Sequence, residues 1–189
     1  MAVRRTKRST AASRNPKQEE GGEENGMNTE LHQLFLDELA DIYNAEQQLT
    51  KALPKLAKAC QNPELREAFE THLEETQNHI SRLDQVAKSL GESLKRKKCA
   101  AMEGLIEEGE EIIDEMEDST ALDAGLILAA QKVEHYEIAS YGGLRAWAEL
   151  MGHDEAAELL QETLDEEKET DEKLNQLAET AANQEARQE

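Results

Sequence analysis

The chain has 189 residues and a formal net charge of −21, and only 3% of its residues are aromatic. Strands draw on aromatic and β-branched side chains to fill a pleated surface, so this composition argues against a β-rich fold. No uncharged apolar run is long enough to span a membrane, and no apolar segment of a secretory signal follows the N-terminal arginines. We therefore expect a cytoplasmic protein without membrane contact, whose two cysteines stay reduced.

The N-terminal segment differs in composition from the rest of the chain. Residues 1–17 carry six basic residues and no acid, and residues 19–26 add four glutamates and three glycines. Such a segment buries too little apolar surface to offset the entropy of ordering it, so we predict a disordered tail over residues 1–27. A short basic arm attracts phosphates, so residues 1–17 could contact nucleic acid. The alternative is a solvated extension without a partner.

Beyond this tail, apolar residues recur every three or four positions, which predicts long amphipathic helices. The first helix extends from about Leu31 to Cys60. Asn62-Pro63 then has the pattern of an N-cap followed by proline at the first helical position, which begins a second helix. Gly91 is a suitable residue to end it.

The second half of the chain repeats this pattern after a connecting segment. A third, shorter amphipathic helix is predicted from about Leu94 to Met116. Thr120 and Asp123 resemble a capping box that begins the fourth helix, which Gly152 ends. Asp154 is a suitable N-cap for the last helix.

These elements define a fold class. Four long helices in two hairpins, joined by a connection that contains a helix of its own, predict an all-α four-helix bundle with one long crossover. We place this bundle at residues 28–182 and expect a frayed C-terminus over residues 183–189.

Two acids fall inside apolar stripes. Glu46 lies between Ile42 and Leu49 in the stripe of the first helix, and Glu137 follows Val133 in that of the fourth. An unpaired buried carboxylate costs several kcal/mol or takes up a proton, so these acids need a compensating cation or proton. The alternative is a hydrogen bond from a nearby tyrosine. The three tyrosines are Tyr43, Tyr136 and Tyr141.

The other two bundle helices supply matching polar residues. His72 and His79 lie near the stripe of the second helix, with Glu75 on its flank. On the last helix Glu166 occupies the flank, and Glu167 is nearer the centre of the stripe. The histidines are either metal ligands or packed core residues, and the flanking acids are either ligands or solvated rim residues.

The two hairpins align without a gap at an offset of 91 residues. This register superposes Glu46 on Glu137 and Glu75 on Glu166. A pseudo-twofold bundle would bring these four carboxylates to one level, which suits a pair of iron or manganese ions. Glu134, three residues before Glu137, is either a further ligand or an exposed acid.

Four stretches of sequence carry a resemblance to known proteins. They are residues 37–46 (DELADIYNAE), 72–76 (HLEET), 98–106 (KCAAMEGLI) and 134–142 (EHYEIASYG). These stretches resemble the YciE/YciF family of bacterial stress proteins, which is ferritin-like. The similarity extends from about Glu30 to Ala178, and the basic tail lies outside it.

The resemblance implies a ferritin-like homodimer with a dinuclear metal site in each bundle. The ferritin-like scheme takes one glutamate from each of two helices, which Glu46 and Glu137 provide, and a glutamate followed three residues later by histidine from each of the others. Neither Glu75 nor Glu166 is followed by that histidine. Glu169 stands three residues after Glu166, where the ferritin-like scheme has histidine. The resemblance therefore favours a site dominated by carboxylates.

We therefore expect a stress-response protein that binds two iron or manganese ions and oxidises iron or consumes peroxide. The candidate ligands are Glu46, His72, Glu75, His79, Glu134, Glu137, Glu166 and Glu169. The alternative is a metal-free helical dimer that acts as an interaction or protective module, with nucleic-acid contact through its basic tail. No phosphate-binding glycine loop or nucleophile elbow supports a kinase, dehydrogenase or hydrolase.

Overall fold

The computed structural model describes residues 30–179, and the regular elements in this range are five helices. They are α1 (Glu30–Ala59), α2 (Pro63–Ser89), α3 (Ala100–Met116), α4 (Leu122–Leu150) and α5 (Asp154–Leu177). The tail expected over residues 1–27 and the frayed end expected over residues 183–189 lie outside the described residues. Within residues 30–179, no helix has both the length and the apolar character needed to cross a membrane.

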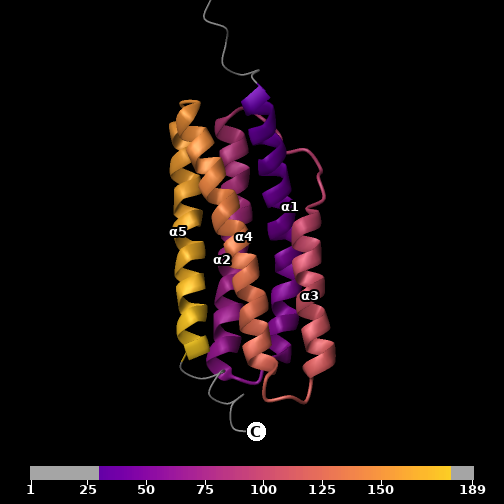
Figure 1. Ribbon diagram of the computed structural model, residues 1–189. Helices are drawn as coiled ribbons and strands as arrows, with labels where there is room; N and C mark the ends of the chain where they lie inside the picture. Colours follow the sequence, from indigo (N-terminus) through magenta and orange to yellow (C-terminus); the bar gives the residue numbers. More distant parts are fainter. Residues whose placement is uncertain (1–29, 180–189) are drawn as a thin grey trace, which may run out of the picture.

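The helices form two antiparallel hairpins, α1 with α2 and α4 with α5 (Figure 1). α2 packs on α5 and α1 packs on α4, so the four long helices enclose one core. α3 lies in the connection between the hairpins and packs outside the bundle against α1 and α4. The predicted four-helix bundle with one long crossover is confirmed, and the fold is ferritin-like.

The core consists of the apolar stripes that the sequence predicts. On α1, for example, Phe35, Leu39, Ile42, Leu49 and Leu53 are all buried. Full burial of one such side chain contributes about 1.5–3 kcal/mol to folding. These stripes, rather than helix propensity, hold the helices together.

The predicted helix ends are mostly correct. The side chain of Asn62 accepts hydrogen bonds from two backbone N–H groups of α2, at 2.8 and 3.1 Å. Gly91 and Gly152, which follow α2 and α4, have φ of 69° and 74°, a conformation that favours glycine. The predicted Asp154 cap is wrong: Asp154 is the first helical residue, and His153 occupies the N-cap position without a side-chain cap bond.

The third helix begins at Ala100 rather than Leu94. Residues 92–99 are not helical, and contacts of Lys97 and Cys99 with α1 fix the end of this segment. The backbone N–H of Cys99 donates to Oδ1 of Asn44 at 2.8 Å, and its thiol sulfur accepts from the N–H of Met102 at 3.4 Å. Cys99 is thus the N-cap of α3, and a bond to a distant helix sets where α3 starts.

The capping box predicted at the start of α4 is also wrong. Ala121 is the N-cap residue and makes no side-chain cap bond. The carboxylate of Asp123 instead accepts from the backbone N–H groups of Gln61 and Asn62, at 2.8 and 2.6 Å. Asp123 therefore ties the α1–α2 turn to the start of α4.

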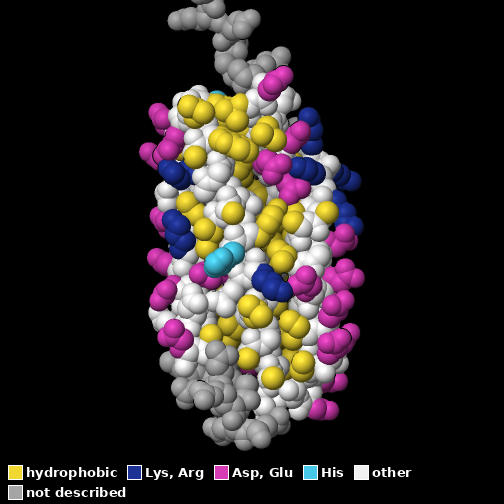
Figure 2. Space-filling model, viewed as in Figure 1, with side chains coloured by type: hydrophobic (Ala, Val, Ile, Leu, Met, Phe, Trp, Pro, Cys, Tyr) yellow, Lys and Arg dark blue, Asp and Glu magenta, His cyan; other side chains and the backbone are white. Residues whose placement is uncertain are grey.

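Most acidic side chains lie on the surface of this bundle. Figure 2 shows them along both flanks of one face, including the flank that α3 forms. Exposed acids are frequent on α3 and directly after it, at positions 107, 108, 111, 115 and 117. Surface carboxylates are solvated and need no partner, so the buried ones require a separate explanation.

Candidate metal centre

Six ionisable side chains meet in the middle of the bundle, and each is at most 3% exposed. They are Glu46 of α1, His72 and His79 of α2, Glu134 and Glu137 of α4, and Glu167 of α5. All four bundle helices therefore contribute. Each residue occupies a position in the inward stripe of its helix, so the helical period that builds the core also brings these groups together.

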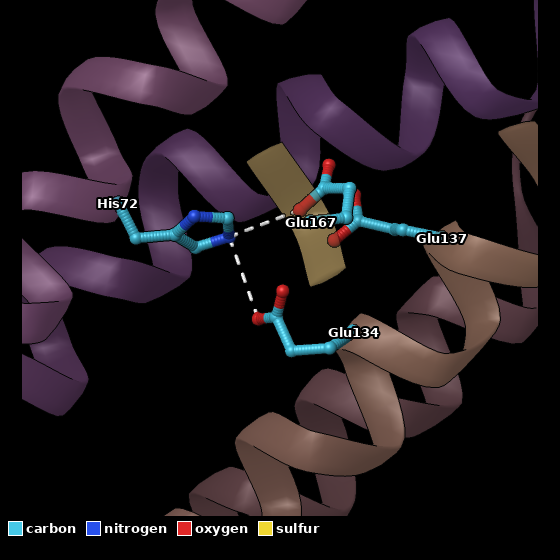
Figure 3. A group of neighbouring side chains, drawn as sticks. All are labelled: His72, Glu134, Glu137 and Glu167. Atoms are coloured by element: carbon cyan, nitrogen blue, oxygen red, sulfur yellow. Dashed lines mark ion pairs between the residues drawn. The ribbon is translucent and has the colours of Figure 1, made fainter. Parts of the chain in front are cut away.

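Four of the six residues form a first group. One ligand atom from each of His72, Glu134, Glu137 and Glu167 lies within 4.8 Å of the others. Figure 3 shows these side chains converging from α2, α4 and α5. Nε2 of His72 is 3.4 Å from Oε1 of Glu134 and 3.9 Å from Oε2 of Glu167. We call this group the His72 position.

A second group, the His79 position, consists of Glu46, His79 and Glu167. Nδ1 of His79 lies 3.1 Å from Oε1 of Glu167 and 3.5 Å from Oε1 of Glu46. Glu167 belongs to both groups: one of its oxygens faces His79 and the other faces His72. Glu167 would therefore be a ligand at either position.

Many of the buried oxygens have no hydrogen-bond partner among residues 30–179. These are both oxygens of Glu137 and of Glu167 and one oxygen each of Glu46 and Glu134. Four carboxylates also outnumber two imidazoles, so negative charge remains in excess even if both histidines are protonated. Unpaired charge in a water-excluded core is strongly unfavourable, so the site needs bound cations or bound protons.

The pKa values show where protons reside when no cation is bound. Burial raises the pKa of Glu134 and Glu137 well above the usual range for a carboxyl group. Burial alone would lower the pKa of both histidines, but the neighbouring carboxylates outweigh it. Glu134 and Glu75 raise the pKa of His72 to about 9, and Glu167 and Glu46 raise that of His79 to about 11.

Two of the predicted ligands lie at the rim. Oε2 of Glu75 is 3.3 Å from Nδ1 of His72, and Oε2 of Glu166 is 2.9 Å from Nε2 of His79. Their side chains are 35% and 37% exposed. Each imidazole thus has one nitrogen toward the interior acids and the other toward a rim carboxylate. This is the arrangement in which an outer carboxylate orients a histidine ligand.

Arg82 fixes the second of these rim acids. Its guanidinium donates to both oxygens of Glu166, at 2.7 and 3.0 Å. This pair, with the hydrogen bond to His79, lowers the pKa of Glu166 in spite of its partial burial. Glu166 therefore remains ionised, and the positive charge of Arg82 balances its negative charge.

The tyrosine alternative holds for one atom only. The hydroxyl of Tyr141 donates to Oε1 of Glu46, whereas Tyr136 donates to Oδ2 of Asp41 at 2.9 Å. Among the described residues, neither oxygen of Glu137 has a hydrogen-bond partner. Tyrosines therefore do not satisfy the buried carboxylates.

The structure brings five of the eight predicted residues into the cluster, leaves Glu75 and Glu166 at its rim and places Glu169 on the exposed face of α5. The residue we did not select is Glu167. The apolar stripe of α5 contained the signal, because Glu167 continues the series formed by Leu160 and Leu164 at helical spacing. The alignment of the two hairpins favoured Glu166 instead, because it pairs with Glu75.

Glu167 also explains the missing ferritin-like pairs. Three residues after Glu167 is Thr170, and three residues before His79 is Thr76. Each of α2 and α5 therefore keeps one half of the glutamate–histidine pair, and threonine stands in the other half. His72 and Glu134 add nitrogen and oxygen atoms that the ferritin-like scheme does not include.

Comparison with known proteins identifies the family of this chain. The family described as "Domain of unknown function (DUF892)" matches residues 30–187. Protein YciF of Escherichia coli strain K12 is 54% identical over 157 residues, which cover 82% of this chain and 95% of YciF. The chain belongs to the DUF892 family, and the resemblance to the YciE/YciF family is confirmed.

Solved structures agree with this assignment. The crystal structure of the E. coli stress protein YciF matches with a TM-score of 0.79 and covers 82% of this chain and 99% of that chain. YcfI from Rhodopseudomonas palustris is 49% identical, with a TM-score of 0.75, and covers 80% of this chain and 96% of that chain. A Xanthomonas campestris protein shares the fold at 24% identity and a TM-score of 0.65, over 83% of this chain and 96% of that one. The chain is thus a member of a YciF-like family of stress proteins.

Proposed function

We propose that this chain is a stress-response protein that holds two iron or manganese ions inside its bundle. The observation that carries this proposal is a set of six oxygens on four buried carboxylates that face two imidazoles and have no hydrogen-bond partner among residues 30–179. A protein core does not retain such a set without a cation or protons to balance it. Oxygen and imidazole nitrogen donors fit iron and manganese, whereas the cluster contains no thiolate.

The residues divide between two ions. His72, Glu134, Glu137 and Glu167 would hold one, and Glu46, His79 and Glu167 would hold the other. When bound, iron or manganese ions supply one-electron chemistry toward dioxygen or peroxide, which supports iron oxidation or peroxide consumption as the activity.

The protein's own contribution is to position and shield the ligands. Glu75 and Glu166 hold the outer nitrogens of the two histidines, which leaves the inner nitrogens free to bind a cation. The hydroxyl of Tyr141 fixes one oxygen of Glu46. Close packing of the surrounding core keeps bulk water away from the carboxylates, so their attraction for a divalent ion is weakly screened.

Metal analysis tests this proposal. The chain would be purified from cells grown with added iron and manganese, and its metal content measured by mass spectrometry. We expect about two ions per chain, as in other two-metal sites, and a marked loss in Glu46→Ala and Glu137→Ala. Glu169→Gln, which alters an exposed acid of α5, is the control and should retain both ions. Full metal content in both alanine variants would overturn the ligand assignment.

The metal-free alternative makes a different prediction. A helical dimer that serves only as an interaction or protective module should have the same melting temperature with and without chelator, because no ligand would bind its folded state. Contact with nucleic acid through residues 1–17 should disappear at raised salt or on removal of residues 1–26. Sedimentation analysis would test the homodimer that the family resemblance implies.

A further inference from the structure

We propose that the two cation positions are unequal and fill in order, the His72 position first, and that Thr76 is the residue responsible for the difference. The inference rests on the proposed dinuclear site and adds to it the order of binding and its structural origin.

The inequality follows from the relation between the two hairpins. The offset of 91 residues pairs Glu46 with Glu137, and it pairs Thr76 with Glu167. A symmetric bundle would carry a carboxylate at both members of the second pair. This chain carries one only, so a single glutamate is shared by both positions.

The two positions consequently differ in charge. The His72 position contains three carboxylates, and both oxygens of Glu137 have no hydrogen-bond partner among the described residues. The His79 position contains two carboxylates, and one oxygen of Glu46 already accepts a hydrogen bond from Tyr141. In a core that screens charge weakly, an additional carboxylate strengthens the attraction for a divalent cation.

Binding of the first ion increases this difference. Glu167 is common to both positions, so an ion at the His72 position draws on the negative charge that a second ion would need. Two cations that shared Glu167 would also repel each other. The His79 position should therefore bind its ion more weakly and later.

Thr76 lies where a further carboxylate would balance the two positions. It is fully buried on α2, four residues after His72 and three before His79. Its hydroxyl donates to the backbone carbonyl of His72 at 2.8 Å, so it is satisfied within its own helix. Thr76 thus occupies a buried position of α2 between the two histidines without contributing charge.

The test is a titration of the metal-free chain with Mn²⁺, in which calorimetry and electron paramagnetic resonance measure the binding. We expect one ion per chain to bind first and a second to bind at least about tenfold more weakly, a difference of about 1.4 kcal/mol. Glu46→Gln should remove the weaker phase and leave the tighter phase, whereas Glu137→Gln should weaken the tighter phase. Thr76→Glu should bring the two constants together, and the similarly shaped Thr76→Val should leave them apart.

The possible failures are distinct. Absence of any Mn²⁺ binding would overturn the proposed dinuclear site itself. Two ions that bind with equal affinity, or loss of the tighter phase in Glu46→Gln, would overturn the order of filling while leaving the site intact. If Thr76→Glu does not fold by circular dichroism, the comparison of Glu46→Gln with Glu137→Gln decides the order alone.

Discussion

The two ends of the bundle and its middle follow opposite rules. Toward the ends, most inward side chains are apolar, such as Phe35 and Leu39 near the start of α1 and Leu65 and Leu126 at the opposite end, and the buried polar exceptions are His32 and Asp123. In the middle, six ionisable side chains take these inward positions. The ends therefore stabilise the fold whatever is bound, whereas the middle is unfavourable until cations or protons neutralise it. The difference teaches that stability and function are separated along the axis of this bundle.

Metal loading should produce the largest effect, and it acts on the middle alone. An ion present at a thousand times its dissociation constant stabilises the folded state by about 4 kcal/mol for each site. Thermal unfolding with added Mn²⁺ and then with chelator measures this shift. Glu167→Gln removes the shared ligand and should abolish it, whereas Glu169→Gln should not. An equal shift in both variants would show that the ions bind elsewhere.

A cavity at an apolar end should be costly with or without metal. Leu126→Ala deletes a fully buried side chain of α4, and we expect a loss of about 2–5 kcal/mol in the free energy of unfolding. Urea denaturation in the presence and absence of chelator checks this value. The loss should be the same in both conditions, because Leu126 lies outside the candidate ligand set. A loss that depended strongly on metal would remove the distinction between ends and middle.

The metal-free protein should become less stable as the pH rises. The pKa of His72 is about 9 and that of His79 about 11 in the folded state, against about 6.5 in an unfolded chain. Their protonation therefore contributes stability that is fully present below pH 6.5 and is lost as the pH rises through the folded values. The raised pKa values of Glu134 and Glu137 act in the same direction.

Between pH 7 and pH 9 we expect the free energy of unfolding in chelator to fall by about 2 kcal/mol for each of the two histidines. Chemical denaturation at a series of pH values measures this slope. In the metal-loaded protein the slope should be smaller or reversed, because cations replace the protons and metal affinity rises with pH. A metal-free protein whose stability increases over this interval would contradict the pKa directions.

Removing one interior carboxyl group should stabilise the metal-free protein. Glu137→Leu replaces a buried carboxyl group that has no hydrogen-bond partner among the described residues with an apolar side chain, and we expect a gain of about 1–2 kcal/mol in chelator. The same substitution should eliminate tight metal binding. The exposed control Glu169→Leu should change stability by less than about 0.5 kcal/mol. A destabilised Glu137→Leu variant would indicate that this carboxyl group has a structural role.

A surface ion pair should have the smallest effect. Lys55 of α1 contacts Glu110 of α3, with side chains 60% and 45% exposed. Water and salt screen such pairs, so Glu110→Gln should cost no more than about 1 kcal/mol. Denaturation at low and high salt would measure the residual difference. A larger cost would mean that α3 depends on its charges rather than on its apolar contacts with α1 and α4.

The sequence was sufficient to predict the fold because apolar periodicity records which face of each helix is buried. The start of α3 was not predictable in this way, because a hydrogen bond between Cys99 and the side chain of Asn44, 55 residues earlier, determines it. Asp123 likewise serves a distant turn rather than its own helix. Sequence patterns indicate contacts between residues that are close along the chain, whereas the bonds of Cys99 and Asp123 join residues that are far apart in sequence.

The candidate site was predictable in part for the same reason. Glu46 and Glu137 interrupt apolar stripes, so the sequence alone places them inside the bundle. Glu166 and Glu167 are adjacent acids about 100° apart on one helix, and only the packing of α5 against α2 decides which one faces inward. A search for identical residues favoured Glu166, because it pairs with Glu75, whereas Glu167 pairs with a threonine.

The most direct test of the account is a crystal structure of the metal-loaded protein with anomalous diffraction measured at the iron and manganese absorption edges. The account predicts two anomalous peaks in the middle of each bundle, both in contact with the carboxylate of Glu167, one beside His72 and the other beside His79. An interior without anomalous peaks, in protein that diffracts well and was crystallised with metal in excess, would contradict it.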